Sequence, residues 1–433
     1  MKRREKSGLP FVVMVVILVV NGMYTKAQDW PQWRGTNREG VSKETGLNLD
    51  WTQKKPPLSW IFRQAGFGYS APTIVGTTLY CQGSSNEKDF AFALDINTGN
   101  LKWKQELGAE YVDPGNRGNG ARGSVTVDGD KLYLIRGGGQ IHCLAAADGK
   151  MIWQKDFTTD FGGRLMSAPN WGFSESPLVD GNLVICTPGG TNGTMAALDK
   201  NTGAVVWRSK EWIDPTGFSS AIVAEVGGIR QYIQQASKGV AGISAKDGKL
   251  LWKFDYDAAR ISAVIPTPVF NDNMVYVSNG YSCGCMGIRL TKEGEGIKAE
   301  TIYTNNRDIS NQHGGVVLIN GYIYGHSDRP SNSWVCQNFK TGEIVWSQND
   351  RDVIGKGSLF AVGDRLILFD MQKGTLAVVA ASPDGWKEFC RIEIPERIKD
   401  NPSTDKLLWT HPVVANGKLY LRDHDLLFCF NLK

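Results

Sequence analysis

The stretch Asp95-Ile96-Asn97-Thr98-Gly99-Asn100-Leu101-Lys102-Trp103 decides the fold of this chain, because its turn and its aromatic residue recur along the sequence. In each copy a large aromatic residue follows the turn glycine by four positions. An Asp or Asn followed by Thr-Gly favours a tight turn, since glycine readily adopts positive φ. The other copies are Asp148-Gly149 before Trp153, Thr202-Gly203 before Trp207, Asp247-Gly248 before Trp252, Thr341-Gly342 before Trp346, and Asp384-Gly385 before Phe389.

The spacing of these aromatic residues indicates the type of repeat. It runs from the low forties to the mid fifties of residues, and a period of about 40 to 50 is typical of four-stranded propeller blades. Helical repeats are the alternative. Short apolar runs such as 131–135 and 366–369, bounded by Gly and Asp, favour strands instead.

Two weaker copies and the C-terminal segment complete the count. Tyr303 fills the wide interval between two aromatic residues, after a longer turn at residues 292–296, and Trp60 precedes the first full unit. Residues 416–430 provide strands but no closing aromatic strand. We therefore predict an all-β, eight-bladed propeller of four-stranded antiparallel blades, in which the strand carrying Trp60 joins the C-terminal strands and closes the ring. The expected structural aromatic residues are Trp60, Trp103, Trp153, Trp207, Trp252, Tyr303, Trp346 and Phe389.

The N-terminal residues indicate export. Basic residues at positions 2–6 precede the apolar run 9–20, and Thr25 and Ala27 form a small-residue cleavage motif, as in a secretory signal. The apolar run is short for a membrane span, which needs about 20 residues, so we favour cleavage near Ala27 over an uncleaved anchor. We expect residues 1–27 to be a signal peptide and the protein to be periplasmic or secreted.

The remaining chain divides into two parts. Residues 28–57 are expected to form an N-terminal clasp, with Trp30, Trp33 and Trp51 as anchors. Residues 58–433 are expected to form the single propeller domain. No linker rich in Pro or Ser interrupts this part of the sequence, and we expect a monomer without a transmembrane span once the signal is cleaved.

The charge balance argues against nucleic acid as a partner. The whole chain has a formal net charge of +4. Residues 1–27 contain five basic residues and one acidic residue, a net +4, so the rest of the chain is formally neutral. No cluster of Lys and Arg with interleaved aromatic residues remains to follow a phosphate backbone.

The eight cysteines are compatible with disulfides in an exported protein. Several lie at equivalent places in the repeat, which favours buried thiols. The pair Cys283 and Cys285 is the exception, because a Cys-x-Cys at a hairpin tip either oxidises with strain or binds a soft metal. Neither role follows from the sequence, and we expect no metal site. The triplet Asp423-His424-Asp425 is a second metal candidate, although an exposed, solvated hairpin is the favoured interpretation.

The repeat unit resembles that of a known superfamily. Ala93-Leu94-Asp95 through Trp103, and Ala197-Leu198-Asp199 through Trp207, resemble the repeat of quinoprotein-type propellers, which include pyrroloquinoline quinone (PQQ) dehydrogenases and the BamB scaffolds of outer-membrane β-barrel assembly. The stretches 29–35, 313–315, 411–412 and 419–423 resemble an exported, uncharacterised PQQ-like branch. In such repeats the turn and the Trp are structural, so the most regular motif says nothing about chemistry.

Functional residues are therefore expected on the face opposite the Thr-Gly turns, where each innermost strand begins. Ser70-Ala71-Pro72 and Pro266-Thr267-Pro268 mark two of these lead-in segments. The same alignment brings Arg122, Glu175, His313, Lys356 and His411 toward one mouth of the channel. These ionisable residues either bind an anionic or sugar-like ligand, with Glu175 or a His as acceptor or base, or solvate the channel. Trp171 and Tyr281 stack on a ligand or pack at the rim.

Two functions remain open. We favour a binding or scaffold protein of the cell envelope that holds a protein or small polar ligand at this mouth. The alternative is a PQQ-dependent alcohol or aldose dehydrogenase, for which the resemblance implies PQQ with Ca²⁺. That resemblance also implies a disulfide of adjacent cysteines and a calcium set of acidic and amide residues. The chain has no adjacent cysteines, and the calcium set has no residue-by-residue match, so catalytic residues cannot be assigned.

Overall fold

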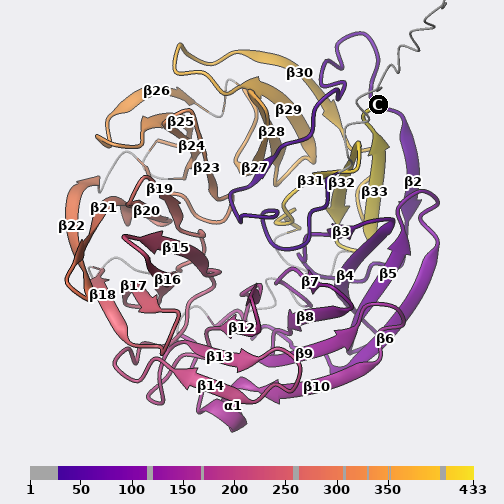
Figure 1. Ribbon diagram of the computed structural model, residues 1–433. Coiled ribbons are helices and arrows are strands. Elements are labelled where there is room, and N and C mark those ends of the chain that lie inside the picture. Colours follow the sequence, from indigo (N-terminus) through magenta and orange to yellow (C-terminus); the bar gives the residue numbers. More distant parts are fainter. Residues whose placement is uncertain are drawn as a thin grey trace, which may run out of the picture.

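The computed structural model describes residues 28–114, 120–166, 170–256, 263–305, 309–328, 331–349, 351, 353–399 and 406–433. The proposed signal peptide, residues 1–27, lies outside the described residues. The described strands form eight sheets arranged around one axis as a closed ring (Figure 1). The prediction of an eight-bladed all-β propeller is therefore confirmed.

We number the blades in chain order, each from its innermost to its outermost strand. Blades 1 to 4 consist of β3 (Thr73–Val75), β4 (Thr78–Ser85), β5 (Lys88–Asp95) and β6 (Leu101–Ala109); β7 (Thr126–Asp128), β8 (Lys131–Ile135), β9 (Gln140–Ala145) and β10 (Met151–Asp156); β11 (Leu178–Asp180), β12 (Leu183–Cys186), β13 (Ala196–Asp199) and β14 (Val205–Arg208); β15 (Ile222–Val226), β16 (Ile229–Ala236), β17 (Gly239–Ser244) and β18 (Leu250–Asp255).

Blades 5 to 8 follow the same antiparallel order. They consist of β19 (Val269–Asn271), β20 (Met274–Asn279), β21 (Gly284–Glu293) and β22 (Gly296–Asn305); β23 (Val316–Ile319), β24 (Tyr322–Ser327), β25 (Ser333–Asn338) and β26 (Ile344–Asn349); β27 (Gly357–Val362), β28 (Arg365–Asp370), β29 (Thr375–Ala380) and β30 (Glu388–Glu393); β31 (Val413–Ala415), β32 (Lys418–Asp423), β33 (Leu426–Asn431) and β2 (Leu58–Phe62). Blade 7 gains a fifth strand, because β1 (Val41–Ser42) pairs parallel with β27.

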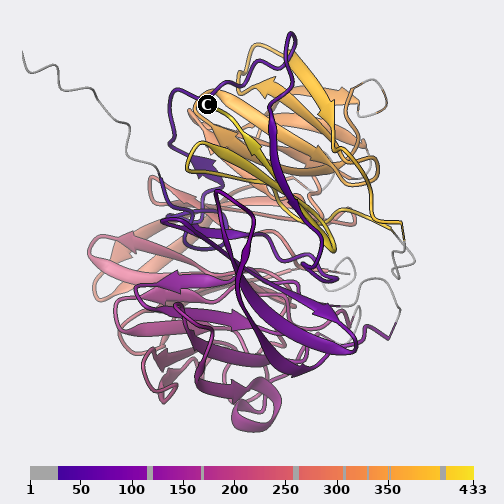
Figure 2. The same cartoon turned by 90° about the vertical axis from the view of Figure 1, so that its right-hand side faces the viewer.

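The ring closes through strands from opposite ends of the chain. The strand β2 pairs antiparallel with β33, and Trp60 lies opposite Cys429. Figure 2 shows this purple strand beside the yellow C-terminal strands. The predicted closure is confirmed, and it leaves no edge strand open between the first and last blades.

The repeated aromatic residues connect neighbouring blades by hydrogen bonds. The indole N–H of Trp103 in blade 1 donates to the carbonyl of Ala146 in blade 2 at 3.0 Å, and Trp153 donates to Lys200 of blade 3 at the same distance. The Tyr303 hydroxyl makes the equivalent bond to Phe339 at 2.8 Å. Trp252 departs from this pattern, because it donates to Gln231 within its own blade.

The turn glycines have a second role besides their positive φ. Gly203 has a φ of +71°, and a Cβ atom at this position would lie 2.8 Å from the ring of Trp153 in the preceding blade. Gly149 is in the same relation to Trp103. The glycine is thus required both by the turn and by the close approach of the neighbouring indole.

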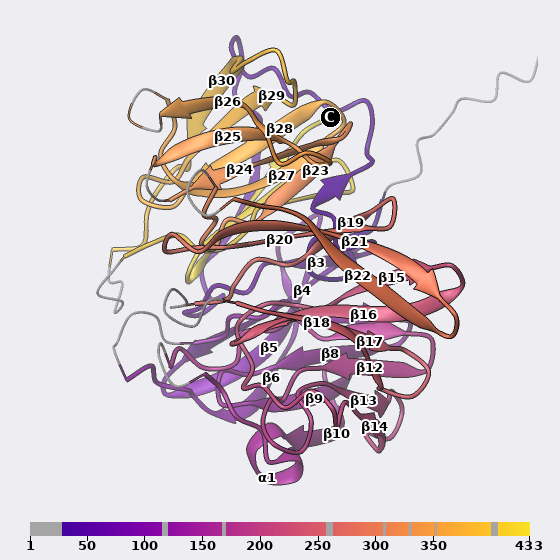
Figure 3. The ribbon, with the colours of Figure 1, turned by 90° about the vertical axis from the view of Figure 1, so that its left-hand side faces the viewer.

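Blade 5 differs from its neighbours in its outer hairpin. The sequence predicted a longer turn before Tyr303, but the structure has longer strands instead: β21 and β22 contain ten residues each, and Glu293 pairs with Gly296 across a two-residue turn. Figure 3 shows this hairpin on the side of the ring, against β18 of blade 4.

The hydrophobic core lies between neighbouring sheets rather than at the axis. Tyr80 and Ala91 of blade 1, for example, pack with Leu132 and Leu144 of blade 2. The second and third strands are buried on both faces, whereas outermost strands such as β6 alternate between exposed and partly buried residues. Seven of the eight cysteines are buried and Cys283 is half-buried, which confirms the burial predicted for the six cysteines outside the Cys283 and Cys285 pair.

The described part contains one short helix, α1 (Phe157–Phe161). Asp156 caps its N-terminus by accepting hydrogen bonds from the amides of Thr158 and Thr159. Across the described ranges, no helix has the length and apolar character needed to cross a bilayer.

Candidate functional site

The N-terminal segment 30–42, which we call the plug, enters the ring beside blades 1 and 2. Trp30 and Ile74 exchange two backbone hydrogen bonds, of 2.8 and 2.9 Å. The carbonyl of Pro31 accepts from the amide of Val127 at 2.8 Å. Both partners lie on innermost strands, so the plug starts at the wall of the channel.

Two arginines then anchor the plug to blades 3, 4 and 6. The Arg38 guanidinium donates to the carbonyls of Ser176 at 3.1 Å, of Ala221 at 2.9 Å, and of Pro177. Arg34 donates to the carbonyl of Val316. Both side chains are buried, and both backbones have a φ of 60°. A planar guanidinium with several donors suits this convergence of carbonyls.

The remaining contacts reach blades 5, 7 and 8. The Trp33 indole donates to Thr267 Oγ1 at 2.8 Å and packs edge-on against His411, with ring centroids 4.6 Å apart. The Gly40 carbonyl accepts from the Ala361 amide at 2.9 Å. One short segment thus contacts all eight blades at or just before their innermost strands. The plug therefore lies on the axis of the ring, as the indigo trace in the middle of Figure 1 shows.

A cavity of about 100 Å³ lies above the plug, on the face where the innermost strands begin. Trp33 and Arg34 of the plug are among the residues that line it, and they form its floor. The predicted residues Arg122, His313 and His411 all line this cavity. Its walls also contain the aromatic side chains Tyr69, Trp171, Phe218 and Trp409.

The aromatic walls form one connected layer. Trp171 stacks on Phe218 with centroids 5.3 Å apart and an interplanar angle of 30°. Trp409 contacts Tyr69 at 5.1 Å and His313 at 5.7 Å between centroids. The side chains in this layer therefore hold one another in place, which gives the cavity a preformed apolar wall.

Both histidines of the cavity are held neutral. The pKa of His411 is lowered to about 3, chiefly by burial and also by the positive charge of Arg34, while the bond between its Nε2 and the His313 carbonyl, at 3.0 Å, acts in the opposite direction. Burial also lowers the pKa of His313 well below its ordinary value, with a further contribution from Lys356. Neither ring nitrogen of His313 has a hydrogen-bond partner among the described residues.

The arginines add positive charge around the cavity. Arg122 lies 3.9 Å from Asp113, and its guanidinium is 5.5 Å from the centre of the Tyr69 ring. Burial lowers the pKa of Arg34 to about 10, partly offset by the attraction of Glu39, so this side chain is still charged at neutral pH.

Two predicted mouth residues are not in the cavity lining. Glu175 is directed into the contact between blades 3 and 4, where Thr187 donates to it from its amide at 2.6 Å and from its hydroxyl at 2.8 Å. Burial raises the Glu175 pKa to about 7, although the bonds from Thr187 and the charge of Arg38 lower it. Lys356 belongs to a polar network with Asp328 and with Gln312, and of these three only Gln312 lines the cavity.

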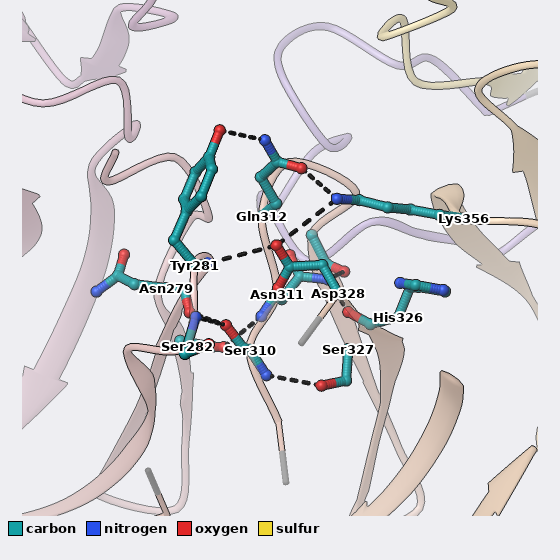
Figure 4. A network of polar contacts seen from close by, with 12 residues as sticks. Asn279, Tyr281, Ser282, Ser310, Asn311, Gln312, His326, Ser327, Asp328 and Lys356 are labelled. Atoms are coloured by element: carbon teal, nitrogen blue, oxygen red, sulfur yellow. Dashed lines mark hydrogen bonds and ion pairs between the residues drawn. The ribbon is translucent and has the colours of Figure 1, made fainter. Parts of the chain in front are cut away.

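Figure 4 shows this second network at the mouth side of blades 5 to 7. Lys356 donates to Gln312 and lies 3.7 Å from Asp328. Gln312 in turn donates to the hydroxyl of Tyr281 at 2.5 Å. The prediction that Tyr281 stacks on a ligand is not tested by these contacts, which place its hydroxyl in the network.

The triplet 423–425 corrects the expectation of a solvated hairpin. Asp423 and His424 are buried, and Asp423 accepts a hydrogen bond from Arg397 at 2.7 Å. Asp425 accepts from the amide of Gly66 at 2.7 Å. The two carboxylates of this hairpin are therefore bonded to protein rather than to water, whereas the ring nitrogens of the buried His424 have no hydrogen-bond partner among the described residues. In the described part of the chain, no three His, Cys, Asp or Glu residues form a group that would hold a metal ion.

Sequence reasoning missed most of the aromatic wall and both floor residues. Three wall residues share a signal that was available: Tyr69, Phe218 and Trp409 each come directly before a lead-in segment, at Ser70, Ser219 and Thr410. The floor had no such signal, because Trp33 and Arg34 are far in sequence from every blade that they contact.

Fold and site together define an eight-bladed propeller whose channel is closed by its own N-terminal segment and open to one face. The family model described as outer membrane protein assembly factor BamB matches residues 91–348, which is more than half of the chain. The protein therefore belongs to this PQQ-like, BamB-type family.

Individual relatives are distant. BamB of Yersinia pestis is 24% identical over 229 residues, which cover 48% of this chain and 51% of that protein. BamB of Moranella endobia is 25% identical over 57% of this chain and 58% of its own length. The chain thus spans about half the length of the curated relatives it matches.

Solved structures share the fold. BamB from Moraxella catarrhalis has a TM-score of 0.57 at 16% identity, with 84% of this chain and 94% of that chain covered. Quinohemoprotein alcohol dehydrogenase from Comamonas testosteroni has a TM-score of 0.61 at 12% identity, covering 93% and 80%. A BamB protein and an alcohol dehydrogenase therefore both share the fold of this chain, and function has to be inferred from the site.

Proposed function

We propose that the protein is an exported binding protein or scaffold of the cell envelope, and that it holds a ligand or partner at the cavity above the plug. The observation that carries this proposal is the cavity itself, which opens to one face: it has an aromatic wall, a floor made by the plug, and a His313 imidazole that has no hydrogen-bond partner among the described residues. Concave sites with apolar walls and a few convergent polar groups are typical of ligand binding.

The surroundings of the site support a binding role. The lining side chains are fixed by ring contacts and by hydrogen bonds from the plug, so little conformational entropy is lost when a ligand binds. The relatives named as outer membrane protein assembly factors are consistent with a role in the envelope. Export rests on the N-terminal sequence, with its basic residues and short apolar run.

The residues present do not fit PQQ in the arrangement that the quinoprotein resemblance implies. The chain has no adjacent cysteines. The described residues include no group of three His, Cys, Asp or Glu side chains placed to hold a metal ion. The cavity of about 100 Å³ is smaller than the roughly 300–1,000 Å³ of pockets that enclose a drug-sized ligand. A binding role therefore accounts for the site better than quinone-dependent oxidation.

The proposal is tested by crosslinking in intact cells of the source organism. A photo-crosslinking residue replaces Asn170, which is exposed next to Trp171 at the mouth, or Asn201, which is exposed in a turn on the opposite face. Cell fractions are then probed for the protein and its adducts. We expect the protein in the envelope fraction and defined adducts from position 170 that are missing from position 201. Equal labelling from both faces, or a protein confined to the cytoplasm, would contradict the proposal.

A further inference from the structure

The ligand class can be inferred from the polar groups that the cavity leaves unpaired, an inference that rests on the proposed binding function. His313 lines the cavity, is only 9% exposed, and its two ring nitrogens are unpaired within the described residues. The buried indole N–H of Trp409 likewise finds no acceptor in the described chain. Buried polar groups are nearly always hydrogen-bonded, and an unpaired one costs about 1–3 kcal/mol.

The ring nitrogens of His313 and the indole N–H of Trp409 favour a ligand with a particular set of hydrogen-bond donors and acceptors. A neutral imidazole has one N–H donor and one nitrogen acceptor, and the indole N–H adds a second donor. A carboxylate only accepts hydrogen bonds, so it leaves the acceptor nitrogen of His313 unpaired. A hydroxyl both donates and accepts. A ligand with several hydroxyl groups therefore satisfies the whole set, whereas a carboxylate does not.

The aromatic wall adds a requirement of shape. Trp171 and Phe218 already stack on each other at 5.3 Å, so they offer one shared face rather than a slot between two rings. A flat heteroaromatic base gains most from such a slot. A pyranose ring has an apolar face of C–H groups and a rim of hydroxyls, which matches one aromatic face with polar groups at its edge.

The floor limits how much of a ligand enters. Trp33 and Arg34 of the plug close the channel below a space of about 100 Å³. The space holds one small ring, and the rest of a longer molecule extends out of the cavity through its mouth. We infer that the cavity binds the terminal pyranose residue of a neutral glycan, with its C–H face on the aromatic wall and its hydroxyls bonded to His313 and to the Trp409 indole N–H.

The experiment measures binding to the purified protein by isothermal titration calorimetry. The neutral probes are the methyl pyranosides of glucose, galactose, mannose and N-acetylglucosamine. The comparison probes are citrate, inorganic phosphate, adenosine, and PQQ with Ca²⁺. We expect saturable binding of at least one neutral pyranoside in the millimolar range, and no binding of the comparison probes at the same site.

Variants separate the chemistry of His313 from its packing. His313→Leu removes both nitrogens and is expected to weaken pyranoside binding by about tenfold or more, the equivalent of one to two hydrogen bonds. His313→Gln retains a donor and an acceptor and is expected to stay within a few-fold of the wild type. Trp386→Phe is the control, because Trp386 packs with Trp346 away from the cavity. Melting curves identify variants that do not fold.

Each result has a defined meaning. Equal weakening by His313→Leu and His313→Gln, in variants that fold, would overturn the assignment of hydroxyl partners to His313. Binding of citrate or adenosine in place of all pyranosides would overturn the ligand class. If no pyranoside binds at tens of millimolar while position 170 still gives crosslinks, the glycan inference is wrong and the binding function stands. If both experiments fail, the proposed function fails with it.

Discussion

Replacing Arg38 with methionine tests whether the plug stabilises the ring. The side chain is 3% exposed, and its guanidinium donates to the carbonyls of Ser176, Ala221 and Pro177 and to Gln32 Oε1. Methionine has a similar length and no donor. The Pro177 carbonyl retains its bond from the Thr126 hydroxyl at 2.6 Å, so the substitution removes the Arg38 donor from two other carbonyls.

The expected magnitude follows from these contacts. Each buried carbonyl that loses its donor costs about 1–3 kcal/mol, or about 2–6 kcal/mol for two. Part of this cost is offset, because the variant no longer buries a guanidinium, whose pKa burial has lowered to about 9 against the attraction of Glu175. We therefore expect Arg38→Met to lower the free energy of unfolding by about 2–4 kcal/mol.

Urea unfolding at neutral pH measures this loss, with Arg289→Met as the control. Arg289 is exposed on β21, and its substitution is expected to change stability by less than about 0.5 kcal/mol. Hydrogen exchange provides a local readout: the amides of Trp30 and Gly40, both bonded within the channel, should exchange at least about tenfold faster in Arg38→Met. A variant as stable as the wild type, with unchanged exchange in the plug, would refute the anchoring role of Arg38.

Three further predictions concern the repeat and the buried titratable residues. Gly203→Ala should destabilise the protein by about 1–3 kcal/mol more than Gly181→Ala, because a Cβ at 203 meets Trp153 at 2.8 Å, whereas none of the described atoms lies within 4 Å of a Cβ at 181. Equal midpoints of urea unfolding for the two variants would contradict this prediction. Lowering the pH below about 6 should reduce the free energy of unfolding by about 1 kcal/mol per pH unit for each buried histidine. The pKa of His411 is lowered to about 3 in the folded protein, chiefly by burial, so the unfolded chain binds protons first. A free energy of unfolding that stays constant from pH 7 to 5 would count against this prediction. Glu175→Gln should gain stability relative to the wild type as the pH rises from about 5 to 7, because burial raises the pKa of Glu175 in the folded protein to about 7 and the carboxyl of the unfolded chain ionises first. Denaturation curves of both proteins at these pH values measure the difference in free energy of unfolding, and a difference that does not change with pH would exclude the effect.

Much of the fold is predictable because its signals are local. The turn glycine and the aromatic residue four positions later specify the outer hairpin of a blade, and their recurrence gives the number of blades. Trp60 at one end and the unpaired C-terminal strands at the other end were sufficient to predict the closure. The strand lengths of blade 5 were not predicted, since Gly294 signals a turn but not how far pairing extends from it.

The site was predictable only in part. Arg122, His313 and His411 belong to lead-in segments that the repeat alignment locates, and all three line the cavity. Glu175 belongs to an equivalent segment but bonds to Thr187 between two blades. The alignment gives the position of a residue along the chain, whereas the irregular backbone of each segment decides where its side chain is directed.

By itself, then, the sequence determined the class of fold, the eight blades and the face on which chemistry was to be sought, because each follows from contacts between residues close together in the repeat. Only the tertiary structure decided that residues 30–42 close the channel and that Trp33, Trp409 and His313 meet around one cavity. These contacts join segments hundreds of residues apart, and they exist only after the ring has closed around the plug.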